Sequence, residues 1–298
     1  MKSKRGLRNE SLLQPILLLS PFLILFFLFT ILPLISSVVL SFTSYDMINL
    51  PKFNGLNNYV RMFLYDDIFK ISIKNTLIFA VITGPIGYAL CFLLAWFINE
   101  LPPIPRGIVS FVFYSPALVG NVYFIWAFIF SGDSYGLANG FLLKYGFITE
   151  PIIWLKDSRY ALAIVIIVQL WMSLGVSFLA NIAGLQNVGT ELYEVAAIEG
   201  IRNRWQEAWY VTLPSMKSIL LFSAVMQIQS AFSVSGVATA LTGNPSTNYI
   251  THTIVTHMTD YGTTRYEMGY AATVSVFLFV LMAVTRWGIG KLLNRLDN

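Results

Sequence analysis

Charged residues are scarce in this chain. Asp, Glu, Lys and Arg make up 11% of the 298 residues, whereas 56% are hydrophobic. A soluble domain carries about 25% charged residues, so the scarcity excludes an ordinary soluble fold and predicts a protein of the lipid bilayer. Backbone groups in hydrocarbon must be satisfied within helices or closed barrels. The apolar runs are continuous rather than alternating, which predicts an all-α integral membrane protein.

Potential metal ligands are also few. The single cysteine, Cys91, lies in an apolar run, which excludes an intrachain disulfide and a cysteine-based metal cluster. His252 and His257 have no third ligand close in sequence, so we expect a docking or surface role for them and no metal site. The net charge of +4 is modest and shows no clustered basic face, which argues against nucleic-acid binding.

Acidic residues are absent from the middle of the long apolar runs. These runs predict six spans, each long enough for the roughly 20 residues that a membrane helix needs. The first is too long for a signal peptide and reads as an uncleaved anchor. The predicted organisation is a tail (1–15), a transmembrane domain (16–290) that contains a cytoplasmic loop (186–216), and a second tail (291–298). The spans are 16–42, 72–98, 108–131, 160–185, 217–241 and 268–290.

The basic residues predict the orientation of the chain in the membrane. With both termini inside, more of the 19 Lys and Arg residues fall on the cytoplasmic side than outside, and those outside lie among acidic residues. Lys and Arg are enriched in cytoplasmic loops. We therefore expect both termini in the cytoplasm, together with the loop between the fourth and fifth spans.

That loop contains the one long segment that reads as water-facing helix, residues 191–216. Thr190 is expected to cap a first helix, Gly200 to end it, and Asn203 to begin a second helix. Leu213-Pro214 is expected to end the second helix, because the residue before proline avoids the helical region. The segment is either an amphipathic connector lying on the bilayer or a docking element for a soluble cytoplasmic partner.

Polar residues within the fourth and fifth spans are candidates for lining a solute path. Polar groups at membrane depth usually face the protein interior or a cavity. In the fifth span they form two neighbouring stripes, and the alternative is that they only hydrogen-bond between helices. The candidates are Gln227, Gln229, Ser230, Ser233, Asn181 and Trp171.

Several motifs resemble one transporter family. Glu194–Gly200, followed by Leu213-Pro214, resembles the E-A-A-x-x-x-G…L-P loop of membrane subunits of bacterial binding-protein-dependent ABC importers. Glu191-Leu-Tyr before this motif and Trp205-Gln206 after it are similar to the carbohydrate branch of the family. Supporting motifs extend the resemblance over most of residues 15–290. They are Asn75-Thr76-Leu77, Gly136-Leu-Ala-Asn139, Leu241-Thr242-Gly243, Tyr261-Gly262 and Met268-Gly269-Tyr270-Ala271-Ala272.

The resemblance implies a type I ABC importer permease fold with six transmembrane helices in the bacterial cytoplasmic membrane. It implies a second homologous permease subunit, an extracytoplasmic solute-binding protein, a sugar or oligosaccharide as solute, and a cytoplasmic ATPase dimer that binds ATP and Mg. No cofactor and no catalytic residue are expected in this chain, which lacks a G-x-x-x-x-G-K-[ST] phosphate loop. The residues that the resemblance assigns to ATPase coupling are Glu194, Ala196, Ala197, Gly200, Leu213 and Pro214.

Three alternatives stay open at this point. An ion-coupled carrier would keep an acidic residue in mid-membrane and show internal repeats, and neither is visible. An intramembrane enzyme would need a nucleophile with a base at depth. An importer for a glycerol phosphate ester or another solute such as a peptide differs only in substrate. A phosphate ester would require Arg or Lys facing the path, and the spans contain few of these.

Overall fold

The computed structural model describes residues 17–120 and 122–295. The regular secondary structure of these residues is almost entirely helical, and their only strands are the two-residue β1 (Thr43–Ser44) and β2 (Lys52–Phe53), paired antiparallel. The chain forms two compact units. Unit 1 holds the described residues up to Tyr65 together with Met258–Phe277, and unit 2 holds Asp66–His257 together with the residues from Leu278. The predicted tail 1–15 and the last three residues of the tail 291–298 lie outside the described residues.

Unit 1 begins with a helix over Leu17–Ser41, which includes a π-helical turn η1 (Phe27–Ile31) and α2 (Leu32–Ser41). None of its most apolar window is buried within the protein, as expected of a helix surrounded by lipid. The β1–β2 hairpin packs closely on the start of α16 (Met268–Arg295) at Gly269, where a Cβ would lie 2.1 Å from the Thr43 carbonyl oxygen. Glycine is therefore required at this contact. The unit's remaining elements are α3 (Asn57–Val60), η2 (Arg61–Tyr65) and η5 (Asp260–Thr264).

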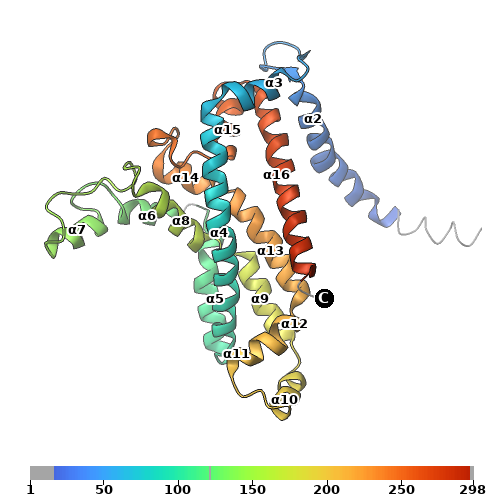
Figure 1. The fold of residues 1–298 in the computed structure, drawn as a ribbon, viewed down its shortest axis with the longest axis vertical. Coiled ribbons are helices and arrows are strands. Elements are labelled where there is room, and N and C mark those ends of the chain that lie inside the picture. Colours follow the sequence, from blue (N-terminus) through green and yellow to red (C-terminus); the bar gives the residue numbers. More distant parts are fainter. Residues whose placement is uncertain (1–16, 121, 296–298) are drawn as a thin grey trace, which may run out of the picture. The chain divides into compact units, whose positions relative to one another are not determined.

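Unit 2 is built around three packed helices, α4 (Asp67–Asn99), α9 (Val176–Asn187) and α13 (Lys217–Phe232). Asp66 caps α4 by accepting a hydrogen bond from the backbone N–H of Phe69 at 2.8 Å. Figure 1 shows α4 running the length of the unit, with α5 and α13 nearby. A buried apolar cluster that includes Cys91, Phe178 and Met216 joins the three helices, which places the core of the unit at their shared contact.

Two pairs of helices in unit 2 are bent spans. α5 (Pro103–Leu118) and α6 (Tyr123–Ile129) meet at 88°, and α8 (Ala161–Met172) and α9 meet at 41°. The sequence predicts spans over 108–131 and 160–185, and a break in the first of them at Pro116, Gly120 and Asn121. Asn121 lies outside the described residues. The second break falls at Ser173–Gly175, where Gly175 adopts φ −113° and ψ −127°, far from helical values.

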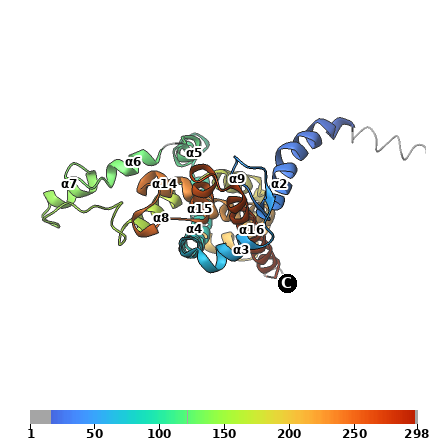
Figure 2. The same ribbon diagram turned by 90° about the horizontal axis from the view of Figure 1, so that it is seen from above.

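The remaining elements of unit 2 are short. They are α7 (Leu137–Lys144), α10 (Thr190–Ile198), α11 (Arg204–Glu207), η3 (Ala208–Thr212), α12 (Leu213–Ser215), α14 (Ser235–Thr242), η4 (Thr247–Tyr249) and α15 (Ile254–Thr259), which ends in unit 1. Seen from above, α6 and α7 extend away from α4 and α9 (Figure 2). The buried Asn139 of α7 organises the loop that follows. Its Nδ2 donates to three backbone carbonyls, and its Oδ1 accepts from Ile152 N and Trp154 Nε1.

The described residues contain four helices long and apolar enough to cross a membrane, and up to six spans if each bent pair is one span. The four are Leu17–Ser41, Asp67–Asn99, Lys217–Thr242 and Met268–Lys291. The predicted fold class, an all-α membrane protein, is therefore confirmed. The helix Asp67–Asn99 starts before the predicted span 72–98, because the Asp66 cap lies ahead of the apolar run.

Candidate functional site

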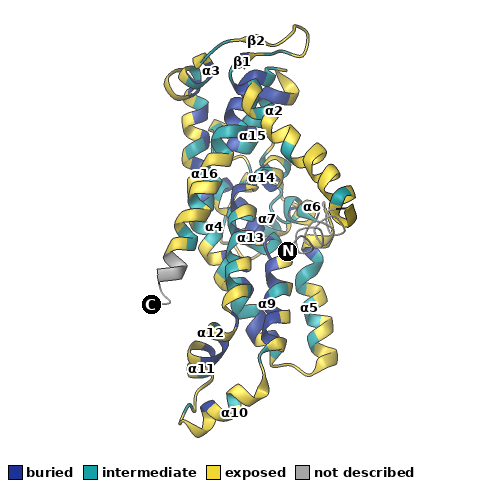
Figure 3. Cartoon of the chain, turned by 90° about the vertical axis from the view of Figure 1, so that its right-hand side faces the viewer, coloured by how far each residue is buried: buried dark blue, intermediate teal, exposed yellow. Residues whose placement is uncertain are grey.

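The loop between α9 and α13 projects a short helix, α10, whose surface is largely exposed (Figure 3). Glu194, Ala197 and Gly200 of the predicted docking residues are exposed. Ala196 is 5% exposed and packs against the chain itself, so it supports the helix and does not lie on its free surface. The predicted docking residues thus divide into a surface group and one supporting residue.

Three large apolar side chains are also exposed on α10: Leu192, Val195 and Ile198, the last of which is 86% exposed. Their spacing of three residues places them along one side of the helix. Exposed apolar side chains that gather on a water-facing segment mark an interaction surface. The docking assignments made from the sequence omit Ile198, although its spacing from Leu192 and Val195 is a signal that could have identified it.

Gly200 ends α10 as predicted. It adopts φ +96°, a left-handed conformation that glycine tolerates without steric cost. The Gly200 N–H donates to the Ala197 carbonyl and the Ile201 N–H donates to the Ala196 carbonyl, at 3.3 and 3.0 Å. This pair of bonds is the Schellman motif, which satisfies the last carbonyls of a helix and turns the chain sharply.

Two local predictions for the loop were wrong. Gly189, not Thr190, is the N-cap of α10, and no side chain caps this end of the helix. Leu213-Pro214 does not end the second helix, because the helix continues through η3 and α12 to Ser215 and bends at Met216. Pro214 lies in the first turn of α12, directly after the π-helical turn η3. Asn203 begins α11 as predicted, and its Oδ1 accepts from Trp205 N at 3.0 Å.

The second half of the loop is anchored to the C-terminal end of α4. Arg204 forms ion pairs with Glu207 at 2.7 Å and with Glu100 at 3.0 Å. The hydrogen bond to Glu207 and the charge of Glu100 raise the pKa of the Arg204 guanidinium above its ordinary value. The Trp205 ring lies 5.0 Å from that of Trp96. α11 is therefore attached to a long helix of the core.

A side-chain hydrogen bond connects α10 to η3, the π-helical turn that follows α11. The Tyr193 hydroxyl lies 3.0 Å from Thr212 Oγ1 of η3. A force on α10 would reach η3 through this contact and through the backbone, and η3 leads directly into α12 and α13. The geometry suits an element that transmits motion from a partner to the membrane helices.

The predicted path residues of the fifth span differ in how far they are buried. Gln227 is buried, and its Nε2 donates to the Ser173 carbonyl at 3.1 Å and to Cys91 Sγ at 2.9 Å. Ser230 Oγ accepts from Gln169 Nε2 at 3.2 Å. These two residues make interhelical hydrogen bonds, as the structural alternative predicted. Gln229 and Ser233, on the neighbouring stripe, are exposed.

The two path candidates of the fourth span differ in burial. Asn181 of α9 is fully buried, and its carboxamide has no hydrogen-bond partner among the described residues. Trp171 of α8 is partly buried, and its ring packs edge-on against Trp126 at 5.6 Å. Because Asn181 is buried and Trp171 is partly covered, the exposed candidates of the fifth span, Gln229 and Ser233, define the candidate path.

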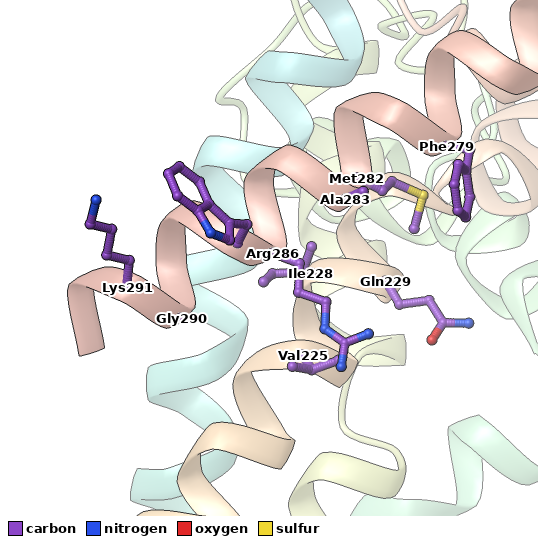
Figure 4. Close-up of a pocket in the computed structure, with 10 residues that line it drawn as sticks. Val225, Ile228, Gln229, Phe279, Met282, Ala283, Arg286, Gly290 and Lys291 are labelled. Carbon is purple, nitrogen blue, oxygen red and sulfur yellow. The ribbon is translucent and has the colours of Figure 1, made fainter. Parts of the chain in front are cut away.

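Gln229 faces a groove between α13 and α16 within unit 2 (Figure 4). The groove has a volume of about 950 Å³, and most of its lining is apolar, including Val225, Ile228, Phe279 and Met282. Gln229 lies about 18 Å along α13 from Lys217, near the middle of a bilayer-spanning helix. A carboxamide at this depth that faces a groove is suited to contact a polar solute.

The two histidines do not lie on the surface, which corrects the prediction from the sequence. His257 is buried, and its Nε2 lies 3.1 Å from Asp66 Oδ2, while its Nδ1 lies 3.4 Å from His252 Nε2. The three groups connect α15 and the residues before it to the N-terminus of α4. No group of three His, Cys, Asp or Glu side chains with metal-binding geometry occurs among the described residues.

Comparisons with known proteins give relatives over nearly the whole chain. The probable ABC transporter permease protein YesP of Bacillus subtilis is 30% identical over 95% of this chain and 91% of its own length. The arabinooligosaccharides transport system permease protein AraP of the same organism is 30% identical over 91% of this chain and 85% of its own.

A solved structure shares the fold. A chain of a bacterial alginate ABC transporter, crystallised with an alginate pentasaccharide-bound periplasmic protein, matches with a TM-score of 0.78 and 22% identity over 99% of this chain and 98% of its own. The family model described as "Binding-protein-dependent transport system inner membrane component" matches residues 101–297. This chain therefore belongs to the family of binding-protein-dependent transport system inner membrane components.

Proposed function

We propose that this chain is one of two related permease subunits that enclose the path of a sugar or oligosaccharide through the cytoplasmic membrane. The family accounts for the transport role. The sugar is supported by the names of the relatives, one of which transports arabinooligosaccharides and one alginate. The groove with Gln229 at mid-depth supports a polar solute.

In this proposal the energy comes from a separate ATPase dimer that binds ATP and Mg and seats on α10. The observation that carries this assignment is the combination of exposed Leu192, Val195 and Ile198 with a helix end fixed by Gly200. A soluble partner would cover the apolar stripe, and Glu194 would offer a carboxylate to a basic group on that partner. The ATPase then acts on α13 through η3 and α12.

The same proposal assigns the outer face to a solute-binding protein, as in the alginate transporter complex. It places both chain termini and α10 in the cytoplasm. Without α10 inside, the ATPase has no access to its docking surface, so the orientation and the coupling assignment depend on each other.

The test replaces Ile198 with Glu. A carboxylate in a desolvated interface is strongly unfavourable, so the Ile198→Glu variant should lose the ATPase on purification from native membranes and lose ATP-dependent uptake in vesicles. The matched control is Leu50→Glu, because Leu50 is equally exposed, at 85%, but lies in the β1–β2 loop. That control should retain the ATPase.

Retention of the ATPase by the Ile198→Glu variant at the wild-type level would contradict docking on α10. Uptake that persists without ATP and stops when ion gradients collapse would instead favour the ion-coupled carrier considered from the sequence.

A further inference from the structure

The groove between α13 and α16 contains one cationic side chain that points into it. Figure 4 shows the Arg286 guanidinium directed across the groove toward α13, close to Val225. Lys291 is the other cation of the lining, and in the same view its side chain points away from the groove. Two basic residues from the same end of one helix thus take opposite directions.

The two directions distinguish two roles. Basic residues near the end of a membrane helix ordinarily extend toward the aqueous interface. Lys291 points away from the groove, and its ammonium lies 5.0 Å from the centre of the Trp287 ring. Arg286 instead extends over an apolar wall, and it has no ion-pair partner among the described residues.

A guanidinium in this setting is complementary to an anion. A charged group that faces an apolar groove without a counter-charge is costly, and such residues in membrane proteins mark solute or ion pathways. Arginine binds a carboxylate through two parallel hydrogen bonds, which makes that group its best-matched partner. Gln229, on the facing helix, offers both a donor and an acceptor for sugar hydroxyls.

We propose that the saccharide carried along this groove bears a carboxylate, as a uronic acid does, and that Arg286 contacts this carboxylate during passage. This inference rests on the function proposed above and specifies its substrate class.

An anionic phospholipid in the groove would also satisfy Arg286, but its acyl chain would then lie against the Gln229 carboxamide in the apolar part of the groove. Leaving an amide in contact with hydrocarbon without a hydrogen bond is unfavourable. The polar group at mid-depth therefore favours a solute over a lipid.

The experiment uses the complete transporter, with its binding protein, ATPase and second permease, reconstituted into vesicles. The probes are a labelled uronic-acid oligosaccharide and its methyl ester, which has the same shape without the charge. Wild-type transporter should carry the acid faster than the ester. The Arg286→Gln variant should lower uptake of the acid by about tenfold to a hundredfold, as expected for the loss of a charge-assisted contact.

Four further measurements define the result. The Arg286→Gln variant should change uptake of the ester less than about twofold, and Lys291→Gln should leave both rates unchanged, because Lys291 points away from the groove. Arg286→Lys should restore part of the acid uptake by keeping the charge without the second hydrogen bond. The ratio of the acid uptake rate of Arg286→Gln to that of the wild type should be the same in vesicles with and without anionic phospholipid.

Equal uptake of acid and ester by the wild type, or an unchanged acid rate in Arg286→Gln, would overturn the proposal. A defect that appears only in vesicles containing anionic phospholipid would replace the solute with a lipid headgroup. Competition by a sugar phosphate but not by the uronic acid would replace the carboxylate with a phosphate. Absence of ATP-dependent uptake of any saccharide would instead contradict the proposed function itself.

Discussion

α10 lies in the projecting loop and α13 in the span that follows this loop, and the two helices place their exceptional residues in opposite ways. α10 is a water-facing helix that leaves Leu192, Val195 and Ile198 exposed. α13 is a membrane helix that buries Gln227 and bonds it to other helices. Water disfavours the exposed apolar side chains of α10, and hydrocarbon disfavours a carboxamide such as that of Gln227. Within this chain, Gln227 is satisfied by hydrogen bonds, whereas the apolar side chains of α10 stay uncovered.

The difference separates structural residues from interaction residues. A polar group at membrane depth that is already hydrogen-bonded stabilises the fold, whereas an apolar group left in water, or a polar group left in a groove, awaits another molecule. By this criterion Gln227 belongs to the first class, and Ile198, Gln229 and Arg286 belong to the second.

The largest expected effect is a difference in stability and sugar uptake between the Gln227→Leu and Gln229→Leu variants. Gln227→Leu removes the donor to the Ser173 carbonyl in a tight contact, because a Cβ on the facing Gly87 would lie only 2.9 Å from Gln227 Oε1. We expect a loss of roughly 1–2 kcal/mol of stability. Gln229→Leu should leave the thermal midpoint unchanged and lower sugar uptake by up to about tenfold. Thermal unfolding in detergent and uptake in vesicles measure the two. Equal loss of stability in both variants would remove the distinction.

A smaller effect is expected from strain at the end of α10. Gly200→Val places a β-branched residue at φ +96°, which costs about 1–2 kcal/mol and should displace Ile198. We expect ATPase co-purification and coupled uptake to fall several-fold, with correct membrane insertion. Gly146→Val is the control, because Gly146 has φ +73° and open surroundings but lies outside the docking loop. If the two variants lowered coupling equally, the effect would be general strain and not docking.

The smallest effect is expected for the bond between α10 and η3. Tyr193→Phe removes the hydroxyl that lies 3.0 Å from Thr212 Oγ1, at a cost of about 0.5–1.5 kcal/mol. Hydrogen exchange in α10 should become faster, while the ATPase still binds. The number of solute molecules transported per ATP hydrolysed should fall. Tyr210→Phe, at an exposed position, should change neither quantity. An unchanged exchange rate in Tyr193→Phe would show that the backbone alone holds α10.

Local signals in the sequence predicted several features correctly. Gly200 and Asn203 were placed because the left-handed stop and the N-cap depend on the residue itself and its immediate neighbours. The end of the second helix was misplaced because the π-helical turn η3 and the start of α12 allow Pro214 within the helical run. A proline's effect depends on where it falls within a helix, which this sequence does not reveal.

The two stripes of the fifth span show the limit most clearly. Gln227 and Gln229 are two residues apart, which is a rotation of about 200° around a helix. They therefore point to nearly opposite sides and cannot share an environment. The spacing distinguishes the stripes but does not reveal which one meets α4 and α9. The same holds for His252 and His257, whose partner Asp66 is distant in sequence.

Composition and hydrophobic run length by themselves determined that this chain is a helical membrane protein, because burial in lipid requires long apolar helices whatever their packing. The motif around Gly200 determined the shape of the projecting loop, because its hydrogen bonds are local. Only the tertiary structure decided that Gln227 is buried, that Gln229 and Arg286 face one groove, and that Ile198 is left exposed. Those outcomes depend on which helix faces meet, and residues far apart in the chain set that arrangement together.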